Sequence, residues 1–154
     1  MSQELTVVII GSTGKQGGAV TRGLLARGHK VRAVTRATNS SQAKSLASAG
    51  ATLVAASLED TAALTQALEG ATSLFAMTVP SGGTDAETRH GIAAADAAKA
   101  AGVHLVFTTV GNANRQTGIP HFDSKYEIEK HIARVGVRAT IHLHRFSCQP
   151  PILL

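Results

Sequence analysis

A chain of 154 residues has room for one domain with a hydrophobic core and for little beyond it. Hydrophobic residues make up 44% of the sequence and aromatic residues only 3%, so the core has to be built from Ala, Val, Leu and Ile. Cys148 is the only cysteine, which excludes an internal disulfide and a cysteine-based metal site, and the net charge of +5 favours an anionic ligand.

The N-terminal residues do not resemble an export signal. They lack a basic start followed by a long apolar region, and no run of about 18 apolar residues occurs anywhere in the sequence. We therefore expect a cytoplasmic protein that does not contact a membrane.

Apolar runs alternate with helical patterns along the chain. We predict strands at 5–10, 30–35, 51–56, 72–78, 103–109 and 137–143. The helices predicted between them lie at 16–28, 40–49, 60–69, 85–101 and 123–135. This alternation predicts an α/β fold with a doubly wound parallel sheet, which is Rossmann-like with strand order 3-2-1-4-5-6.

Capping residues support these boundaries. Asp60 is expected to cap a helix N-terminus, and left-handed glycines are expected after five helices, at Gly28, Gly50, Gly70, Gly102 and Gly136. The two long irregular stretches, 79–84 and 110–122, follow strands. They are therefore expected at the carboxyl edge of the sheet, where ligands bind in this architecture.

The most informative motif is the glycine turn between the first strand and the first helix, Gly-Ser-Thr-Gly-Lys-Gln-Gly at 11–17. Positions without a Cβ let backbone N–H groups approach an oxyanion, and the next helix directs its N-terminus at a phosphate. We predict a dinucleotide site here, formed by Gly11, Thr13, Gly14, Lys15, Gln16 and Gly17. The alternatives are a glycine-rich turn of another α/β protein and, for Lys15, a merely exposed lysine.

Arg36 ends the second predicted strand, where NAD-binding domains often have an acid that binds the ribose hydroxyls. An arginine pairs instead with a 2′-phosphate, so NADP(H) is favoured over NAD(H). The first fifty residues contain seven Lys or Arg and one acid, which agrees with a polyanionic ligand. Direct nucleic-acid binding ranks lower because aromatic residues do not interleave with these cations. Arg22, Arg27 and Lys44 can equally be solvated helix residues.

Several stretches between residues 5 and about 141 resemble the NmrA-like group of atypical short-chain dehydrogenases/reductases. They are the glycine turn, Thr-Arg at the end of the second strand, Val-Phe-Thr-Thr-Val in the fifth strand and, most specifically, Pro-His-Phe-Asp-Ser-Lys at 120–125. In the wider superfamily a Tyr four residues before a Lys acts as the general acid, while the Lys binds the nicotinamide ribose. Here Lys125 matches that lysine and His121 stands in place of the tyrosine.

The resemblance implies further roles at single positions. Thr109, at the end of the fifth strand, matches a substrate-orienting residue, although it can simply fill a strand. Thr78 would pass beside the nicotinamide. At the adenine end, Ser57 replaces an acid common in the family, and backbone groups of Leu58 are expected to contact the base. His121 can donate a proton near neutral pH, but a neutral histidine without a partner makes a poorer acid than a tuned phenol.

After Ile141 the resemblance ends, and the region that forms most of the substrate pocket in the family is largely missing. We predict an NAD(P)-binding domain at 1–143 and an irregular tail at 144–154. His142 and His144 alternate as in a strand, but two histidines without a third ligand do not support a metal site.

The sequence leaves three functions open, and it does not decide whether the protein catalyses a reaction. The first is an NADP(H)-binding protein that works as a redox-responsive regulator or sensor, with a regulatory protein partner and with oligomerisation allowed. The second is an NADP-dependent reductase of quinones or other small carbonyl compounds, with His121 or a water supplying the proton. The third is an inactive truncated fragment.

Overall fold

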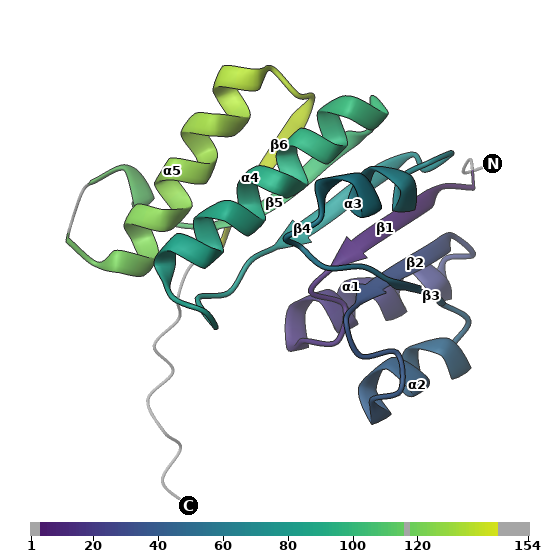
Figure 1. Cartoon of the computed structure of the whole chain (residues 1–154). Coiled ribbons are helices and arrows are strands. Elements are labelled where there is room, and N and C mark those ends of the chain that lie inside the picture. The colour runs from purple at the N-terminus through teal and green to yellow at the C-terminus, as the bar shows by residue number, and fades with distance from the viewer. Residues whose placement is uncertain (1–3, 116–117, 145–154) are drawn as a thin grey trace, which may run out of the picture.

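The computed structural model describes residues 4–115 and 118–144, and its centre is a six-stranded parallel sheet (Figure 1). The strand order is β3-β2-β1-β4-β5-β6, which confirms the predicted topology. The strands are β1 (Thr6–Ile10), β2 (Lys30–Thr35), β3 (Thr52–Ala55), β4 (Ser73–Met77), β5 (His104–Val110) and β6 (Ala139–His144). The helices are α1 (Lys15–Ala26), α2 (Ser41–Ser48), α3 (Thr61–Ala67), α4 (Thr84–Ala101) and α5 (Pro120–Val135).

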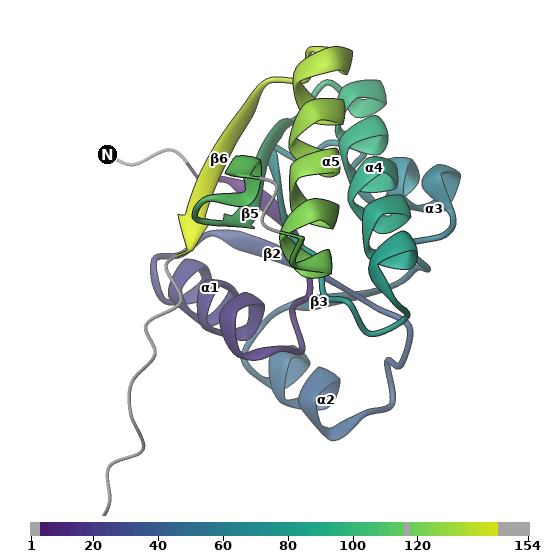
Figure 2. The same ribbon diagram turned by 90° about the vertical axis from the view of Figure 1, so that its left-hand side faces the viewer.

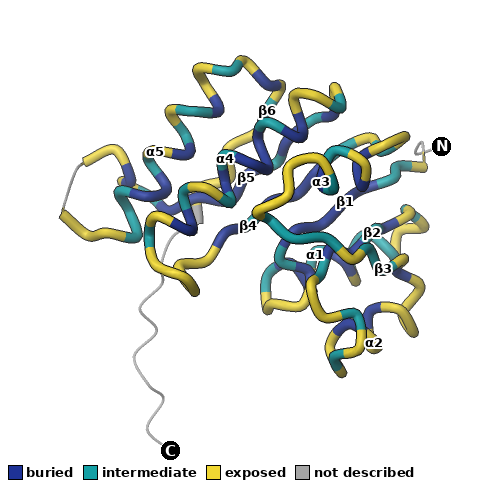
Figure 3. The backbone as a smooth tube through the Cα atoms, in the orientation of Figure 1, coloured by how far each residue is buried: buried dark blue, intermediate teal, exposed yellow. Residues whose placement is uncertain are grey.

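Helices cover both faces of the sheet (Figure 2). On one face, α1 and α2 pack over Val7, Ile9 and Phe75. On the other face, α3, α4 and α5 pack over Val8, Leu105 and neighbouring strand residues. The strands in the middle of the sheet are buried on both sides, as Figure 3 shows for β1, β4 and β5. This burial explains the continuous β-branched runs of the sequence.

The predicted cap at Asp60 is present, and Ser40 caps a second helix. The Asp60 side chain accepts a hydrogen bond of 2.9 Å from the amide of Ala63, and Ser40 accepts one of 3.2 Å from Ala43 at the start of α2. All five glycines predicted at helix ends have a positive φ, between +63° and +104°. Most predicted boundaries differ from the structure by one or two residues, as expected from frayed helix ends.

One boundary is wrong in a way that matters. The stretch 110–122 was expected to be irregular, but β5 continues to Val110, a 3-10 turn spans Ala113–Arg115, and α5 already begins at Pro120. Proline is favoured at the first helical position because its missing N–H would have no partner there. His121 therefore lies in the first turn of α5, one helical turn before Lys125.

The carboxyl ends of the parallel strands meet at one edge of the sheet, and the connections that leave this edge surround the site described below. None of the described helices is both long and apolar enough to cross a membrane. Of the predicted tail, His144 belongs to β6, and 145–154 lie outside the described residues.

Candidate functional site

The glycine turn follows β1 and requires its glycines for steric reasons. Gly11 has a φ of +80°, and the amide of Gly14 donates to the Gly11 carbonyl over 3.0 Å. A Cβ at Gly17 would lie 2.2 Å from the Gly11 oxygen, so only glycine allows α1 to start this close to the turn. Gly14 caps α1 without a side-chain hydrogen bond, which leaves the first amides of the helix to an outside acceptor.

A cleft of about 690 Å³ opens beside this turn, lined by the connections that follow β1, β2, β3 and β4. Predicted site residues that line it are Gly11, Thr13, Gly14, Arg36, Leu58 and Thr78, together with Ser57. Lys15 and Gln16 belong to the first turn of α1 and do not line the cleft. Gly17 does not line it either, but its missing side chain lets α1 pack against the backbone of Gly11. The shape and the glycine geometry fit a dinucleotide with its phosphates over the start of α1.

Arg36 follows β2 at the rim of the cleft and is exposed to solvent. The acid that lines the same cleft, Glu59, is held by His90 across 2.8 Å and lies 3.7 Å from Arg89. The hydrogen bond from His90, together with the charge of Arg89, keeps the pKa of the Glu59 carboxyl below its usual range. The negative charge of Glu59 is thus engaged by α4, and the Arg36 guanidinium remains available to a ligand.

Next to Thr78, which lines the cleft, lies a buried polar network centred on Glu87 of α4, whose side chain has no exposed surface. Lys125 of α5 is 3% exposed, and its Nζ lies 3.1 Å from Glu87 Oε1. The same ammonium donates to the Thr78 carbonyl over 2.8 Å and to Thr78 Oγ1 over 2.7 Å. Ser124 Oγ completes the network with a 2.7 Å bond to Glu87 Oε2. Thr78, which follows β4, also donates its hydroxyl to Glu87. The Glu87 carboxylate of α4 therefore links this helix both to α5 and to the connection after β4.

Burial and the neighbouring charges shift the pKa values of Glu87 and Lys125 in opposite directions. Burial alone would raise the pKa of Glu87, but the Ser124 hydroxyl and the Lys125 charge outweigh it and lower that pKa below its ordinary value. Burial also lowers the pKa of Lys125, and the Glu87 carboxylate offsets part of this shift. Glu87 is thus ionised at neutral pH and acts as the counter-ion that permits a buried lysine.

His121 has a carboxylate partner. Its Nδ1 lies 2.9 Å from Glu87 Oε2, and its side chain is 28% exposed. Because the ionised carboxylate can only accept a hydrogen bond, Nδ1 carries a proton and Nε2 is the ring atom left for other contacts. Neither His121 nor Lys125 belongs to the lining of the cleft, which the network reaches through Thr78.

The hydroxyls of two neighbouring threonines of β5 differ in their hydrogen bonding. Thr109, predicted to orient a substrate, is buried and donates its hydroxyl to Glu129 of α5. Thr108 is buried as well, and its hydroxyl has no partner within the described residues. The assigned role of Thr109 remains a prediction, while its observed contact joins β5 to α5.

Sequence reasoning missed Glu87, although a signal was present. Glu87 shares one helical face with Gly91, Ala94 and Ala98, all of which are buried. An acid in line with small residues at this spacing has to be buried and therefore needs a counter-charge. Its charged partner Lys125 could not be named in advance because it comes from α5, which is remote in the sequence.

The chain matches the model of the NmrA-like family over residues 3–149. The NmrA-like family domain-containing oxidoreductase FrzB of Cladobotryum sp is 33% identical over 149 residues, with 88% of this chain and 44% of FrzB covered. The chain spans less than half the length of the curated relatives it matches.

Solved structures of two proteins illustrate the shared fold. NmrA, a negative transcriptional regulator solved in complex with NADP, has a TM-score of 0.80 at 26% identity, covering 91% of this chain and 45% of NmrA. NmrA has also been solved with NAD. The NADPH-dependent quinone oxidoreductase QOR2 of Escherichia coli, complexed with NADPH, has a TM-score of 0.75 at 30% identity, covering 88% of this chain and 47% of QOR2.

Proposed function

Because the chain belongs to the NmrA-like family, we propose that it binds NADP(H) and works as a redox-responsive regulator rather than as an efficient enzyme. The observation behind cofactor binding is the cleft of about 690 Å³ whose floor is the glycine turn. The amides at the start of α1 would hold the pyrophosphate, and Gly17 permits the close approach that this requires.

NADP(H) is proposed over NAD(H) because of the charges around the cleft. Arg36 takes the place of the acid that would bind free ribose hydroxyls, and Glu59 is occupied by His90. An NADP complex of NmrA and an NADPH complex of QOR2 support this choice, although NmrA has an NAD complex as well. We assign the pyrophosphate to Gly11, Thr13 and Gly14, with Lys15, Gln16 and Gly17 shaping the turn.

The regulatory assignment is supported by how the network uses Lys125. Its ammonium is directed to Thr78 and Glu87 and is nearly inaccessible to solvent. The position four residues before it is a histidine and not the tyrosine that ordinary members of the wider superfamily have there. Lys125 and Thr78 would thus form part of the nicotinamide end of the cleft. A protein partner, and not a nucleic acid, would recognise the cofactor-bound state of the chain.

A reductase is the second candidate, favoured by the contact between His121 and Glu87. The Glu87 carboxylate fixes the orientation and the tautomer of the His121 ring, as a positioned proton donor requires. Bound NADPH supplies hydride, and His121 would supply the proton to a reduced quinone or carbonyl oxygen, with Thr109 in the substrate-orienting role. This candidate requires the His121 ring to reach the substrate when the cofactor is bound.

Binding and turnover measured on the same preparation distinguish these functions. We expect calorimetric titration to give tighter binding of NADPH than of NADH, and we expect no sustained loss of NADPH absorbance with a panel of quinones. Steady turnover that is lost in His121→Ala and kept in His142→Ala, an exposed histidine of β6, would replace the regulator by the reductase. Failure to bind either dinucleotide would exclude both functions.

A further inference from the structure

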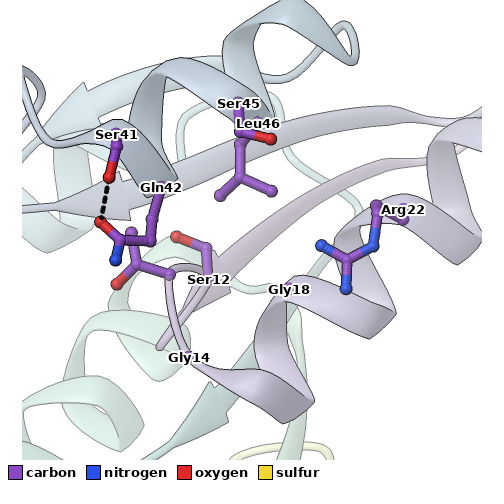
Figure 4. Close-up of a pocket in the computed structure, with 9 residues that line it drawn as sticks. Ser12, Gly14, Gly18, Arg22, Ser41, Gln42, Ser45 and Leu46 are labelled. Atoms are coloured by element: carbon purple, nitrogen blue, oxygen red, sulfur yellow. Dashed lines mark hydrogen bonds between the residues drawn. The ribbon is translucent and has the colours of Figure 1, made fainter.

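Two further features of the described surface lie outside the large cleft. A pocket of about 280 Å³ between α1 and α2 has Arg22 in its lining (Figure 4). It shares Thr13, Gly14 and Gln42 with the cleft, so the two hollows adjoin. The outer edge of β6 lies apart from both, since none of its residues lines either of them.

β6 is an edge strand, and its outer side has no neighbouring strand within residues 4–115 and 118–144. Its six residues include no proline, lysine or carboxylate, which are the residues that commonly protect an exposed edge from a second strand. The opposite edge strand, β3, has only four residues. Among the described residues, β3 contributes no large exposed hydrophobic side chain, whereas β6 contributes Ile141 (38% exposed) and Leu143 (61% exposed).

The backbone groups of alternate β6 residues point to this open edge. The Arg138 carbonyl, just before the strand, accepts a hydrogen bond of 2.8 Å from a β5 amide. With the observed parallel register, the even-numbered residues of β6 direct their amide and carbonyl groups at β5. The amide and carbonyl groups of Ala139, Ile141 and Leu143 consequently point outward, where only solvent or another strand can satisfy them.

The side chains of the same three residues lie on the face of the sheet that α5 covers. Ile141 and Leu143 are the register partners of Phe107 and Thr109 in β5. Phe107 belongs to the core beneath α4 and α5, Thr109 donates to α5, and Ala139 packs against that core. Because register partners share a face, the open edge presents free backbone groups and apolar side chains together.

We propose that this edge pairs with the same edge of a second copy of the chain, antiparallel and about a two-fold axis beside Ile141. Ile141 would exchange both backbone hydrogen bonds with the partner's Ile141, and Leu143 would do so with the partner's Ala139. The large leucine thus meets a small side chain in both symmetric pairs. On the other face Thr140 would lie opposite the partner's His142, so no two histidines oppose each other.

A second copy is favoured as the occupant because the edge is complementary to itself. The outward donors and acceptors are spaced symmetrically about Ile141, as a closed two-fold contact requires. Residues 139–143 contain no Lys, Arg, Asp or Glu, so the paired segment brings no fixed like charges together. The net charge of +5 on each copy opposes association only at longer range, and salt screens that repulsion.

Sedimentation velocity at increasing protein concentration tests the pairing. The wild-type chain should pass from monomer to dimer, at lower concentration when the salt is raised. Leu143→Lys should weaken dimerisation about ten-fold, because both symmetric cross-strand pairs lose an apolar partner and gain a charge. The control is Val79→Lys, which adds the same charge at another exposed apolar position, 48% exposed and outside β6, and it should dimerise like the wild type.

Cross-linking tests the register independently. In a Cys148→Ser background, Ile141→Cys places the two thiols opposite each other, in a pair whose Cα atoms are about 5.5 Å apart. Leu143→Cys separates them by about 13 Å along the strands. We expect oxidised glutathione to convert the first variant into a disulfide-linked dimer and to leave the second monomeric. Cross-linking of both variants alike, or of neither, would contradict the proposed register.

The remaining outcomes are decisive as well. Equal weakening by Leu143→Lys and Val79→Lys would show that added charge, and not the β6 edge, controls association. A full chain that stays monomeric at every concentration would mean that another segment, such as the one after His144, occupies the edge, and would overturn the proposal. Neither result bears on NADP(H) binding, because the pairing uses no residue of the cleft.

Discussion

Glu87 illustrates how a single residue determines the properties of the site. Its carboxylate accepts hydrogen bonds from Thr78 and Ser124, faces the Lys125 ammonium and holds the His121 ring. A buried pair of charges is strongly destabilised when one partner is removed, because the other is left without compensation. The sequence suggests Lys125 as the important residue. In the structure, both Lys125 and His121 are held in place by contacts with Glu87.

We therefore predict that Glu87→Gln destabilises the fold by about 3 kcal/mol near neutral pH. The folded-state pKa of Glu87 lies below its unfolded value, so its contribution is complete above the unfolded pKa and is lost as the pH falls through the folded one. The penalty of Glu87→Gln should accordingly shrink in acid. Urea unfolding at neutral pH and at about pH 4 measures it.

The control for this prediction is Glu127→Gln, which removes an exposed carboxylate paired with Lys130 on the same surface helix as Lys125. Exposed pairs of this kind contribute about 0–1 kcal/mol, so the control should unfold nearly like the wild type. A penalty for Glu87→Gln that is the same at both pH values would contradict an ionised Glu87 in the network.

At the scale of elements, the site depends on the close approach of α4 and α5. Gly91 of α4 faces Ile128 of α5, which is fully buried. A Cβ at Gly91 would lie 2.4 Å from Ile128 Cδ1 and 2.8 Å from its Cγ2. The small residue thus allows the two helices to pack closely and brings Glu87 and Lys125, one turn away on each helix, into contact.

We predict that Gly91→Ala destabilises the protein by about 1–3 kcal/mol, because the added methyl overpacks this contact. Combined with Ile128→Ala, which removes the opposing atoms, the same change should cost less than it does alone. The free energies of unfolding of the two single variants and the double variant measure this coupling.

The matched control is Gly23→Ala on α1, where a Cβ would meet only the tip of Arg27 at 3.4 Å. Alanine is favoured over glycine by about 1 kcal/mol within a helix, so this variant should be neutral or more stable. Additive effects at Gly91 and Ile128 would show that the contact between α4 and α5 is not tight.

At the scale of the whole molecule, the sheet brings four loops together around one cleft. The loops after β1, β2, β3 and β4 are separate in the sequence, and the strand order places them side by side at the carboxyl edge. A ligand in this cleft would contact both halves of the sheet and should stabilise all of it. Ligand binding and global unfolding are therefore linked.

We predict one cooperative thermal transition whose midpoint rises when NADPH is added. At a concentration of about 100 times Kd, binding adds about 2.7 kcal/mol, which corresponds to roughly 5–10 °C for a domain of this size. NADH at the same concentration should give a smaller shift, and differential scanning calorimetry measures both. A broad transition without a shift would favour the inactive fragment over the two functional hypotheses.

Local rules explain how much of this protein could be predicted. The alternation of apolar runs and helical stretches predicted the sheet and its strand order, and positive-φ glycines at five helix ends were recognised from their spacing. The glycine turn was located for the same reason, since its geometry depends on residues within one short segment. The start of α5 was missed because Pro120 was assigned to a loop and not to a first helical turn.

The sequence by itself thus determined the architecture and the position of the cleft, and it indicated that residues such as Arg36 lie at the rim of this cleft. Only the tertiary structure decided that the buried Lys125 pairs with Glu87 and donates a hydrogen bond to Thr78, and that His121 contacts the same carboxylate. It also placed Arg22 in the lining of a pocket beside the glycine turn. The physical reason is range. Helix, strand and turn preferences act between near neighbours, whereas burial and counter-charges depend on which distant elements pack against each other.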